Sequence, residues 1–479
     1  MASEHNVIIA GLGLAGLSAA GALAGRGLDI VVLDENFQSG GQYLRSVSRS
    51  LGVDSRPVRE RLKRYGHQLI ENLDQPGITV RQGTQITGWE SDGSIWTLGE
   101  HGRIERYRAD YVILATGARE RFLPFPGWTL PGVISTGAGQ ILVKSAGMLP
   151  GRFPVIGGAG PLPLALAGEI SASGGRVQAY WNQSSWSQQF NTLKGCRHHI
   201  AKVMLGTRCL ARLLVSRTEM LHGFKVIEAH GEKQLEEVVV AAMNRDGAAV
   251  QGTERTFSTD CLAVGYGFVP NLELAMAAGC ELEHDSTKGG WVVKVAENLQ
   301  SSVPSVFATG ELTGIGGADK SIIEGRLAGL AVADLAGAKN DGDSQKQRLS
   351  LRKLRQRELA FGALINDLVQ PPPNMLNDLP DETIICRCED IDLGQIREQI
   401  RNGYNSLDAL KKATNSGMGN CQGRTCGPII QDVLAALTQV AAGEVPPYSV
   451  RNPIKPVPLA ALAGFDNDDP CWSRPDGGK

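Results

Sequence analysis

The sequence feature that most constrains the fold is a glycine-rich turn close to the N-terminus. An apolar run at residues 7–10 leads into Gly-Leu-Gly-Leu-Ala-Gly at residues 11–16. An alanine-rich stretch then precedes a second apolar run that ends on Asp34. A dinucleotide-binding βαβ unit requires this order of strand, tight turn, helix, strand and terminal acid. The pattern therefore predicts an α/β chain whose first parallel sheet holds a nucleotide.

Each residue of the turn has a predicted role in that unit. Gly11 permits the tight turn, Gly13 lets the backbone approach a pyrophosphate, and Gly16 lets helix and strand pack closely. The free N–H groups at the helix N-terminus favour the negative charge of the phosphates, and the carboxylate of Asp34 can accept hydrogen bonds from the adenosine ribose. The predicted binding residues of this region are Gly11, Gly13, Ala15, Gly16, Asp34 and Glu35.

Three later segments resemble those that surround the nucleotide in large FAD-binding folds, which implies that they surround the same nucleotide here. Residues 39–42 form a tight glycine turn, and residues 110–114 form a buried strand that ends in Ala-Thr-Gly. Residues 306–311 lead into a glycine-rich loop and a helix at 321–335. These segments add Gly41, Gln42, Ala115, Thr116, Gly117, Gly310 and Glu311 to the predicted site. The pattern leaves open whether the nucleotide is FAD or another adenine nucleotide such as ATP or ADP.

A second, altered fingerprint follows in the middle of the chain. A predicted strand at 153–156 enters Gly-Gly-Ala-Gly-Pro-Leu-Pro at residues 157–163, where Pro163 takes the position of the third glycine. The next strand ends near Tyr180 and Trp181 without a carboxylate for a ribose. Because helix and strand packing does not need that acid, we expect a Rossmann-like domain in which NAD(P)H binding is weakened.

The second strong motif is a set of four cysteines near the C-terminus. Cys386 and Cys388 form a C-x-C pair and Cys421 and Cys426 form a C-x4-C pair, with predicted amphipathic helices at 392–402 and 406–414 between them. The other cysteines of the nine are scattered, which favours a metal site in a reducing cytoplasm over a disulfide framework. A site with four thiolates suits either a [2Fe-2S] cluster or structural zinc.

The overall composition excludes several other classes of protein. A formal net charge of −2 gives no electrostatic reason to expect nucleic acid or an anionic membrane as a partner. The N-terminus lacks the form of a signal peptide, and no apolar run is long enough to span a bilayer. We therefore expect a cytoplasmic protein, or one attached peripherally to a membrane through its partners.

The order of these features predicts the domain organisation of the 479 residues. Two Rossmann-like dinucleotide-binding domains, the first of them discontinuous, are followed by a small helical module that carries the four cysteines. The predicted units are an FAD-type domain at 1–120 and 258–335, an NAD-like domain at 121–257, a linker at 336–380, the cysteine module at 381–440 and an extended tail at 441–479.

The first fingerprint and the Ala-Thr-Gly strand together resemble the two-dinucleotide-domain flavoproteins of the glutathione-reductase-like superfamily. Disulfide reductases of that superfamily carry a cysteine pair beside the flavin, whereas this chain has no cysteine before Cys196. Thiol–disulfide chemistry at a flavin is therefore not expected. The cysteine region resembles the bacterioferritin-associated-ferredoxin-like domain, which implies that Cys386, Cys388, Cys421 and Cys426 bind a [2Fe-2S] cluster.

Over nearly its full length the chain resembles the α (A) subunits of heteromeric amino-acid and opine dehydrogenases. The segments at 40–45, 124–133, 310–319 and 417–426 carry this resemblance. It implies an electron-transfer subunit that holds an FAD-type nucleotide and a [2Fe-2S] cluster, with an FMN at the interface with a partner. That partner would be a β subunit related to D-amino-acid oxidases that oxidises a C–N bond, with or without a small third subunit.

In such a complex a quinone or other acceptor would receive the electrons, and the catalytic residues for the substrate would lie on another chain. The sequence motifs alone are also compatible with two other functions. One is a self-contained NAD(P)H-dependent reductase that passes electrons through its own cluster. The other is a non-enzymatic scaffold whose first pocket holds ATP or ADP.

Overall fold

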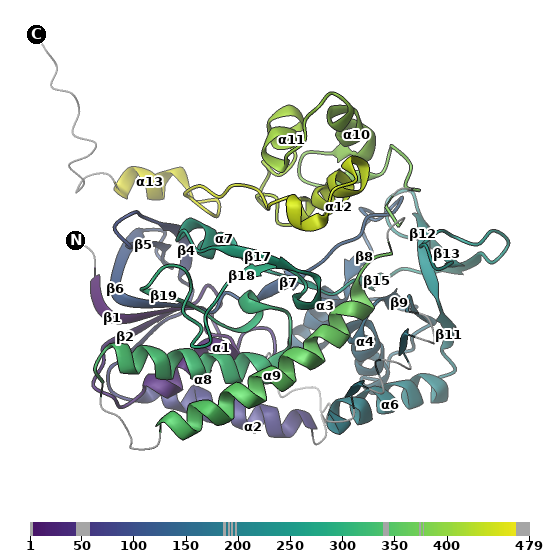
Figure 1. Ribbon diagram of the computed structural model, residues 1–479. Helices are drawn as coiled ribbons and strands as arrows, with labels where there is room; N and C mark the ends of the chain where they lie inside the picture. Colours follow the sequence, from purple (N-terminus) through teal and green to yellow (C-terminus); the bar gives the residue numbers. More distant parts are fainter. Residues whose placement is uncertain are drawn as a thin grey trace, which may run out of the picture.

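The computed structural model describes residues 3–44, 58–184, 199–338, 344–372 and 378–465, together with 188–189, 192, 195–196 and 375–376. Figure 1 shows a body of two sheet domains with a small helical module, residues 393–438, packed on one side of it. Among the described residues, no helix is both long and apolar enough to cross a bilayer.

The first domain is built on a seven-stranded sheet of order β3-β2-β1-β6-β5-β4, with β19 added beside β6. Strands β1, β2, β3, β6 and β19 pair in parallel, and β4 and β5 extend the sheet as an antiparallel meander. The strands are β1 (Ser3–Ala10), β2 (Ile30–Leu33), β3 (Ile78–Arg81), β4 (Gln85–Trp89), β5 (Ile95–Leu98), β6 (Ile104–Leu114) and β19 (Val306–Ala308).

Helices α1 (Leu14–Leu23) and α8 (Ala318–Leu335) cover one face of this sheet (Figure 1). They approach very closely because both present small residues at the contact. A Cβ added at Gly325 would lie 2.0 Å from the carbonyl oxygen of Ala15, and one at Gly329 would lie 2.7 Å from that of Ala19. Helix α2 (Val58–Glu71) follows β2 in the chain, and residues 45–57 before it lie outside the described part of the chain.

The segment that the sequence predicts as a linker, 336–380, contains a long helix, α9 (Ser344–Val369). Helix α9 packs along α8, and its Leu351 is buried in the core of the first domain. Its Arg355 pairs with the buried Glu324 of α8 at 2.7 Å. The middle of this segment is therefore part of the folded body.

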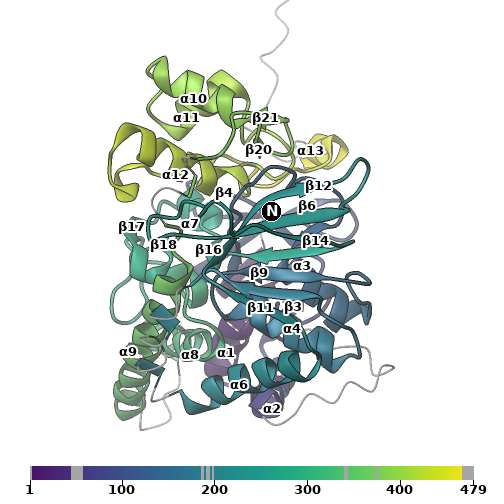
Figure 2. The ribbon, with the colours of Figure 1, turned by 90° about the vertical axis from the view of Figure 1, so that its right-hand side faces the viewer.

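The second domain contains a five-stranded parallel sheet of order β11-β10-β9-β15-β8 and a three-stranded antiparallel sheet, which Figure 2 shows side by side. Strands β7 (Ala118–Glu120) and β16 (Phe268–Pro270) form the crossing between the two domains. The other elements are β8 (Val133–Ser135), α3 (Thr136–Ile141), β9 (Val155–Gly158), α4 (Pro161–Ala172), β10 (Ala179–Asn182), α6 (Ile200–Val215), β11 (Glu219–His222), β12 (Phe224–His230), β13 (Glu237–Ala242), β14 (Arg255–Ser258) and β15 (Leu262–Gly265).

The cysteine module consists of a short β20–β21 pair and three helices. The two predicted helices between the cysteine pairs are present, and each starts at a capping residue: Asp392 caps α10 together with Gln395, and Ser406 caps α11. Its elements are β20 (Ile384–Cys386), β21 (Ile391–Asp392), α10 (Leu393–Arg401), α11 (Leu407–Thr414) and α12 (Cys426–Thr438).

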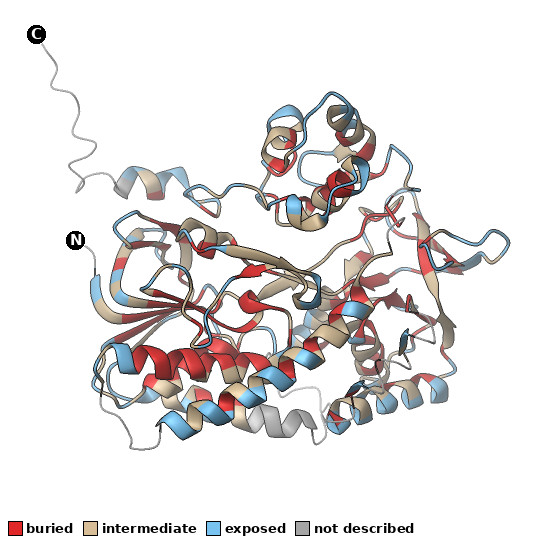
Figure 3. Cartoon of the chain, in the orientation of Figure 1, coloured by how far each residue is buried: buried red, intermediate tan, exposed pale blue. Residues whose placement is uncertain are grey.

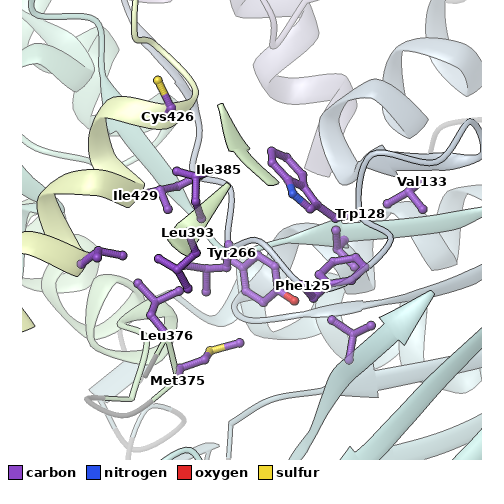
Figure 4. Close-up of a cluster of buried hydrophobic side chains, with 14 of the residues drawn as sticks. Phe125, Trp128, Val133, Tyr266, Met375, Leu376, Ile385, Leu393, Cys426 and Ile429 are labelled. Carbon is purple, nitrogen blue, oxygen red and sulfur yellow. The ribbon is translucent and has the colours of Figure 1, made fainter. Parts of the chain in front are cut away.

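The cysteine module and the second domain share one hydrophobic core. Figure 4 shows Phe125 and Trp128 of the second domain beside Ile385, Leu393 and Ile429 of the module. Figure 3 shows buried residues on the module and on the second domain, and those of both units belong to one cluster. The indole N–H of Trp128 also donates to the carbonyl of Ile384 at 2.7 Å. This shared core holds the cysteine module against the body.

The predicted extended tail returns to the first domain. The side-chain oxygen of Asn452 accepts from the N–H of Trp89 at 3.1 Å, and its side-chain nitrogen donates to the carbonyl of Trp89 at 2.7 Å. The N–H of Ile454 donates to the carbonyl of Thr87 at 2.6 Å. Two short helical pieces interrupt the tail, η7 (Ala442–Glu444) and α13 (Leu459–Phe465). Residues 466–479 lie outside the described residues.

Candidate functional site

A cavity of about 1260 Å³ opens at the carboxyl ends of the first sheet and extends to helices α4 and α6 of the second domain. A dinucleotide-binding sheet places its ligand at this edge. Every predicted nucleotide residue except Gly16 lines the cavity: Gly11, Gly13, Ala15, Asp34, Glu35, Gly41, Gln42, Ala115, Thr116, Gly117, Gly310 and Glu311. The structure thus brings together segments that are far apart in the sequence.

The glycine turn has the geometry that close approach of a phosphate requires. Gly11 has a φ of +106°, and a Cβ there would lie 2.4 Å from the carbonyl oxygen of Ala115. A Cβ at Gly16 would lie 1.9 Å from the carbonyl oxygen of Gly11. By contrast, a Cβ at Gly13 would meet nothing within 4 Å. The open space at Gly13, which lines the cavity, is a cradle that fits a pyrophosphate.

Asp34 lies at the end of β2 but is already engaged by the protein. Its Oδ2 accepts a hydrogen bond from the N–H of Leu12 at 2.5 Å. Its Oδ1 accepts from the N–H and the side chain of Asn36 at 2.7 and 2.8 Å. A carboxylate offers about four acceptor positions, so one remains for a ribose hydroxyl. The neighbouring Glu35 is half exposed and forms an ion pair with Lys455 of the tail.

Glu311, one of the predicted nucleotide residues, closes the N-terminal end of α8. Its carboxylate accepts hydrogen bonds from the N–H groups of Gly316 and Gly317 at 2.8 and 3.0 Å. Burial raises the pKa of Glu311, against the opposing effects of Lys320 and of these two N–H groups. Glu311 therefore occupies the anion-binding end of this helix.

Behind Glu311 lies a buried polar cluster that sequence reasoning missed. Lys320 is completely buried, and its Nζ donates to the carbonyl of Gly310 at 2.6 Å and to Thr313 at 2.8 Å, and pairs with Glu324 at 2.9 Å. Burial opposes ionisation of Glu324, but Lys320 and Arg355 hold its pKa below the usual value. The only signal in the sequence is a lysine and a glutamate four positions apart at the start of a predicted helix.

The second fingerprint keeps its turn and lacks an acid at the ribose position. Gly158 has a φ of +125°, and a Cβ there would lie 2.0 Å from the carbonyl oxygen of Gly265. The helix α4 begins directly after it, with Pro161 in its first turn. At the end of β10, the fully buried ring of Trp181 packs over Gly157. The strand ends on Asn182, which pairs with Gly158, so an amide stands where a nicotinamide dinucleotide would need a carboxylate.

The four predicted metal-binding cysteines form two pairs. Cys386 is hydrogen-bonded to Cys426, and Cys388 is hydrogen-bonded to Cys421. In the described part of the chain, no group of three or more His, Cys, Asp or Glu side chains converges closely enough to hold a single metal ion. Two pairs of thiols suit a [2Fe-2S] cluster, in which each iron takes two thiolates.

Backbone N–H groups surround these sulfurs. The thiol of Cys426 and the N–H groups of Gly417, Glu389 and Cys388 lower the pKa of Cys386 to about 5 although burial opposes the shift. The thiolate is the form that ligates metal, and hydrogen bonds to the sulfurs are typical of iron–sulfur sites. The residues present therefore fit a cluster.

A second cavity, of about 420 Å³, lies between the first domain and the cysteine module. Three charged residues, Arg119, Glu273 and Arg424, line both cavities and form the wall between them. Arg424 stands in the C-x4-C loop itself. Sequence reasoning missed all three, because nothing in the chain indicates that these segments meet.

Two family models match the chain. Residues 5–333 match the family described as pyridine nucleotide-disulphide oxidoreductase, and residues 384–436 match the BFD-like [2Fe-2S] binding domain. The second match includes all four cysteines. The predictions of two dinucleotide-binding domains and of a C-terminal [2Fe-2S] module are confirmed.

Individual relatives extend this likeness to nearly the whole chain. It is 30% identical over 477 residues to the A subunit of opine oxidase from Rhizobium meliloti (strain 1021), covering 96% of this chain and 99% of that protein. It is 31% identical over 466 residues to the HcnB subunit of hydrogen cyanide synthase from Pseudomonas aeruginosa, covering 96% and 99%. The crystal structure of L-proline dehydrogenase from P. horikoshii has the same fold, with a TM-score of 0.69 and 19% identity over 96% of this chain and 79% of that one.

Proposed function

This chain belongs to the pyridine nucleotide-disulphide oxidoreductase family, in the branch that contains HcnB and the A subunit of opine oxidase, and we propose that it is the electron-transfer subunit of a heteromeric dehydrogenase. The partner, a β subunit related to D-amino-acid oxidases, oxidises a C–N bond of an amino acid or opine. Electrons then pass through flavin and the [2Fe-2S] cluster of this chain to a quinone or another acceptor.

The observation that carries the proposal is the shared wall between the nucleotide cavity and the cluster loop. Arg424 stands between two of the cluster cysteines and also lines the nucleotide cavity. A flavin converts two-electron chemistry into single-electron steps, and a cluster carries single electrons. A chain that places these two sites on opposite sides of one wall is suited to relay electrons.

The second cavity is where we place the FMN. Its lining combines flat apolar surface from Trp291 and Tyr448 with the cations Lys412 and Arg451. This combination is typical of sites for a planar ring that carries a phosphate. The cavity also touches the cysteine loop through Gln422 and Arg424. We propose that a partner subunit completes this site.

Two features support a partner, and not NAD(P)H, as the electron donor. The second fingerprint offers Asn182, and no carboxylate, at the strand end where a ribose-binding acid is needed. The opine oxidase relative and HcnB are, by their names, subunits of larger enzymes. We therefore assign the substrate pocket to the partner and name no substrate-oxidising residue in this chain. We also propose that the complex is cytoplasmic, or peripheral to a membrane through its partners.

Co-purification tests this proposal directly. The chain is tagged in its native host, and bound proteins and cofactors are identified after mild isolation. We expect a flavoprotein subunit, FMN, two irons per chain, and FAD or another adenine nucleotide released by heat. Zinc in place of iron, or a chain isolated without any partner, would contradict the assignment.

The cluster ligands are tested by two cysteine substitutions. Cys421→Ser should abolish the visible absorbance of the cluster and electron delivery to an artificial acceptor. Cys280→Ser is the matched control, because Cys280 is buried in the first domain, away from the module. Retention of the cluster in Cys421→Ser, or its loss in the control, would argue against the four ligands named here.

A further inference from the structure

The wall between the two cavities contains a chain of polar contacts that begins at the nucleotide cavity. Asn271 donates through its side chain to the carbonyl of Thr116 at 2.8 Å and through its backbone N–H to the carbonyl of Gly117 at 3.0 Å. Arg119 then donates from Nη1 to the side-chain oxygen of Asn271 at 2.9 Å. The position of Arg119 is thus tied to the loop that is predicted to contact the nucleotide.

The same chain of contacts continues into the cluster loop. The Nε of Arg119 donates to the backbone carbonyl of Arg424 at 3.1 Å. Arg424 in turn donates from its N–H and from Nη1 to the carbonyl of Cys421 at 3.1 and 3.3 Å. A displacement of either arginine therefore acts on the loop that carries Cys421 and Cys426.

This wall carries more positive than negative charge. Arg119 Nη1 lies 2.8 Å from Oε1 of Glu273, and Arg424 Nε lies 3.8 Å from the same oxygen. Two guanidinium groups therefore share one carboxylate. Their side chains are 25% and 19% exposed, and that of Glu273 is 17% exposed. Because partly buried charges are weakly screened by salt, the surplus positive charge acts on both cavities.

We propose that Arg424 is a positioning residue through which an anionic nucleotide in the first cavity lowers the reduction potential of the cluster. Reduction adds one electron to the cluster, so a nearby guanidinium favours the reduced form. A nucleotide phosphate that engages Arg424 offsets this charge and makes reduction less favourable. The inference rests on the nucleotide and the cluster of the proposed function, but it needs neither partner nor substrate.

The coupling has a reciprocal consequence. If a nucleotide disfavours reduction, then reduction must weaken nucleotide binding by the same factor. We expect ADP to bind the oxidised chain about fivefold more tightly than the chain reduced with dithionite, which is the lower end of the usual range for coupled sites. Equilibrium dialysis under anaerobic conditions measures both affinities.

The decisive test follows the cluster by EPR in a redox titration of the full chain freed of its bound nucleotide, with and without saturating ADP. The wild-type cluster should have a lower potential with ADP. Without ADP, the cluster of Arg424→Gln should already have a lower reduction potential than that of the wild type, and ADP should not lower it further. In Arg424→Lys, ADP should lower the reduction potential as it does in the wild type. Arg401→Gln is the matched control, because Arg401 is an exposed residue of the cysteine module that lines neither of the two cavities, and it should respond like the wild type.

An unchanged wild-type potential at saturating ADP, or an equal ADP shift in Arg424→Gln, would overturn the inference. If Arg424→Gln does not assemble iron, Arg119→Gln replaces it, since Arg119 lies outside the cysteine module. In Arg119→Gln, ADP must no longer lower the reduction potential of the cluster. A decrease as large as that of the wild type would again overturn the inference. Absence of a partner subunit would contradict the proposed function and would leave this measurement unaffected.

Discussion

Two glycines of the same turn should respond differently to substitution by alanine. A Cβ at Gly16 would lie 1.9 Å from a backbone oxygen, whereas a Cβ at Gly13 would meet only the open cavity. Gly16→Ala should therefore lower the free energy of unfolding by about 3 kcal/mol. Gly13→Ala should fold normally but bind nucleotide at least about tenfold more weakly, a loss of about 1.4 kcal/mol.

Thermal unfolding and isothermal titration with ADP measure the two effects separately. Each variant is the control for the other, since they lie three residues apart in one turn. Equal losses of stability in both variants would contradict the cradle that we place at Gly13.

Glu311 should make stability depend on pH. Its pKa is raised above the ordinary value of 4.5, so the folded chain holds a proton that the unfolded chain releases. The wild type therefore loses stability as the pH rises from about 4.5 through the raised pKa. Glu311→Gln lacks this loss of stability. The melting temperature of the variant minus that of the wild type should therefore be larger at pH 8 than at pH 5.

This comparison is made without nucleotide, and Glu297→Gln serves as the control because Glu297 is exposed at the surface. If the difference in melting temperature between Glu311→Gln and the wild type is the same at pH 5 and pH 8, the folded wild type does not hold this proton on Glu311.

Sequence reasoning found the residues of the nucleotide cavity that belong to a local pattern, such as Gly11 and Asp34. It could not find Lys320, Arg119 or Arg424, because their roles depend on partners hundreds of residues away or on burial that no local pattern encodes. It also assigned Asp34 only to the ribose, whereas its carboxylate mainly holds Leu12 and Asn36.

At the scale of elements, the attachment of helix α9 to α8 can be tested through its arginines. Arg355 pairs with Glu324, whose side chain is completely buried, whereas Arg352 pairs with Glu297, whose side chain is 81% exposed. Arg355→Leu should lower the free energy of unfolding by about 2 kcal/mol, because it removes a hydrogen bond to a buried carboxylate that Lys320 still neutralises. Arg352→Leu should cost less than about 1 kcal/mol.

Chemical denaturation of the two variants in parallel measures this difference. Similar small losses would mean that α9 is only loosely attached, as the sequence prediction of a linker implies. The polar stretch at 339–346, the basic helix expected after it and the three prolines at 371–373 led to that prediction. By contrast, α10 and α11 were predictable, because caps and amphipathic spacing are local signals.

At the scale of the whole molecule, the order of the modules could be read from the sequence, but their packing could not. The βαβ fingerprints and the cysteine pairs are local motifs. The core shared by the cysteine module and the second domain, with Trp128 and Ile385 in contact, joins residues that no motif connects. The return of the tail to β4 through Asn452 is equally hidden in the sequence.

The central claim is that this chain relays electrons from a partner and does not take them from NAD(P)H. The most direct measurement is the EPR signal of the [2Fe-2S] cluster, recorded anaerobically for the isolated chain and for the complex isolated from its host. We predict that NADH leaves the isolated chain oxidised, and that an amino acid or opine from a panel reduces the cluster only in the complex. Rapid reduction of the isolated chain by NADH would contradict the account.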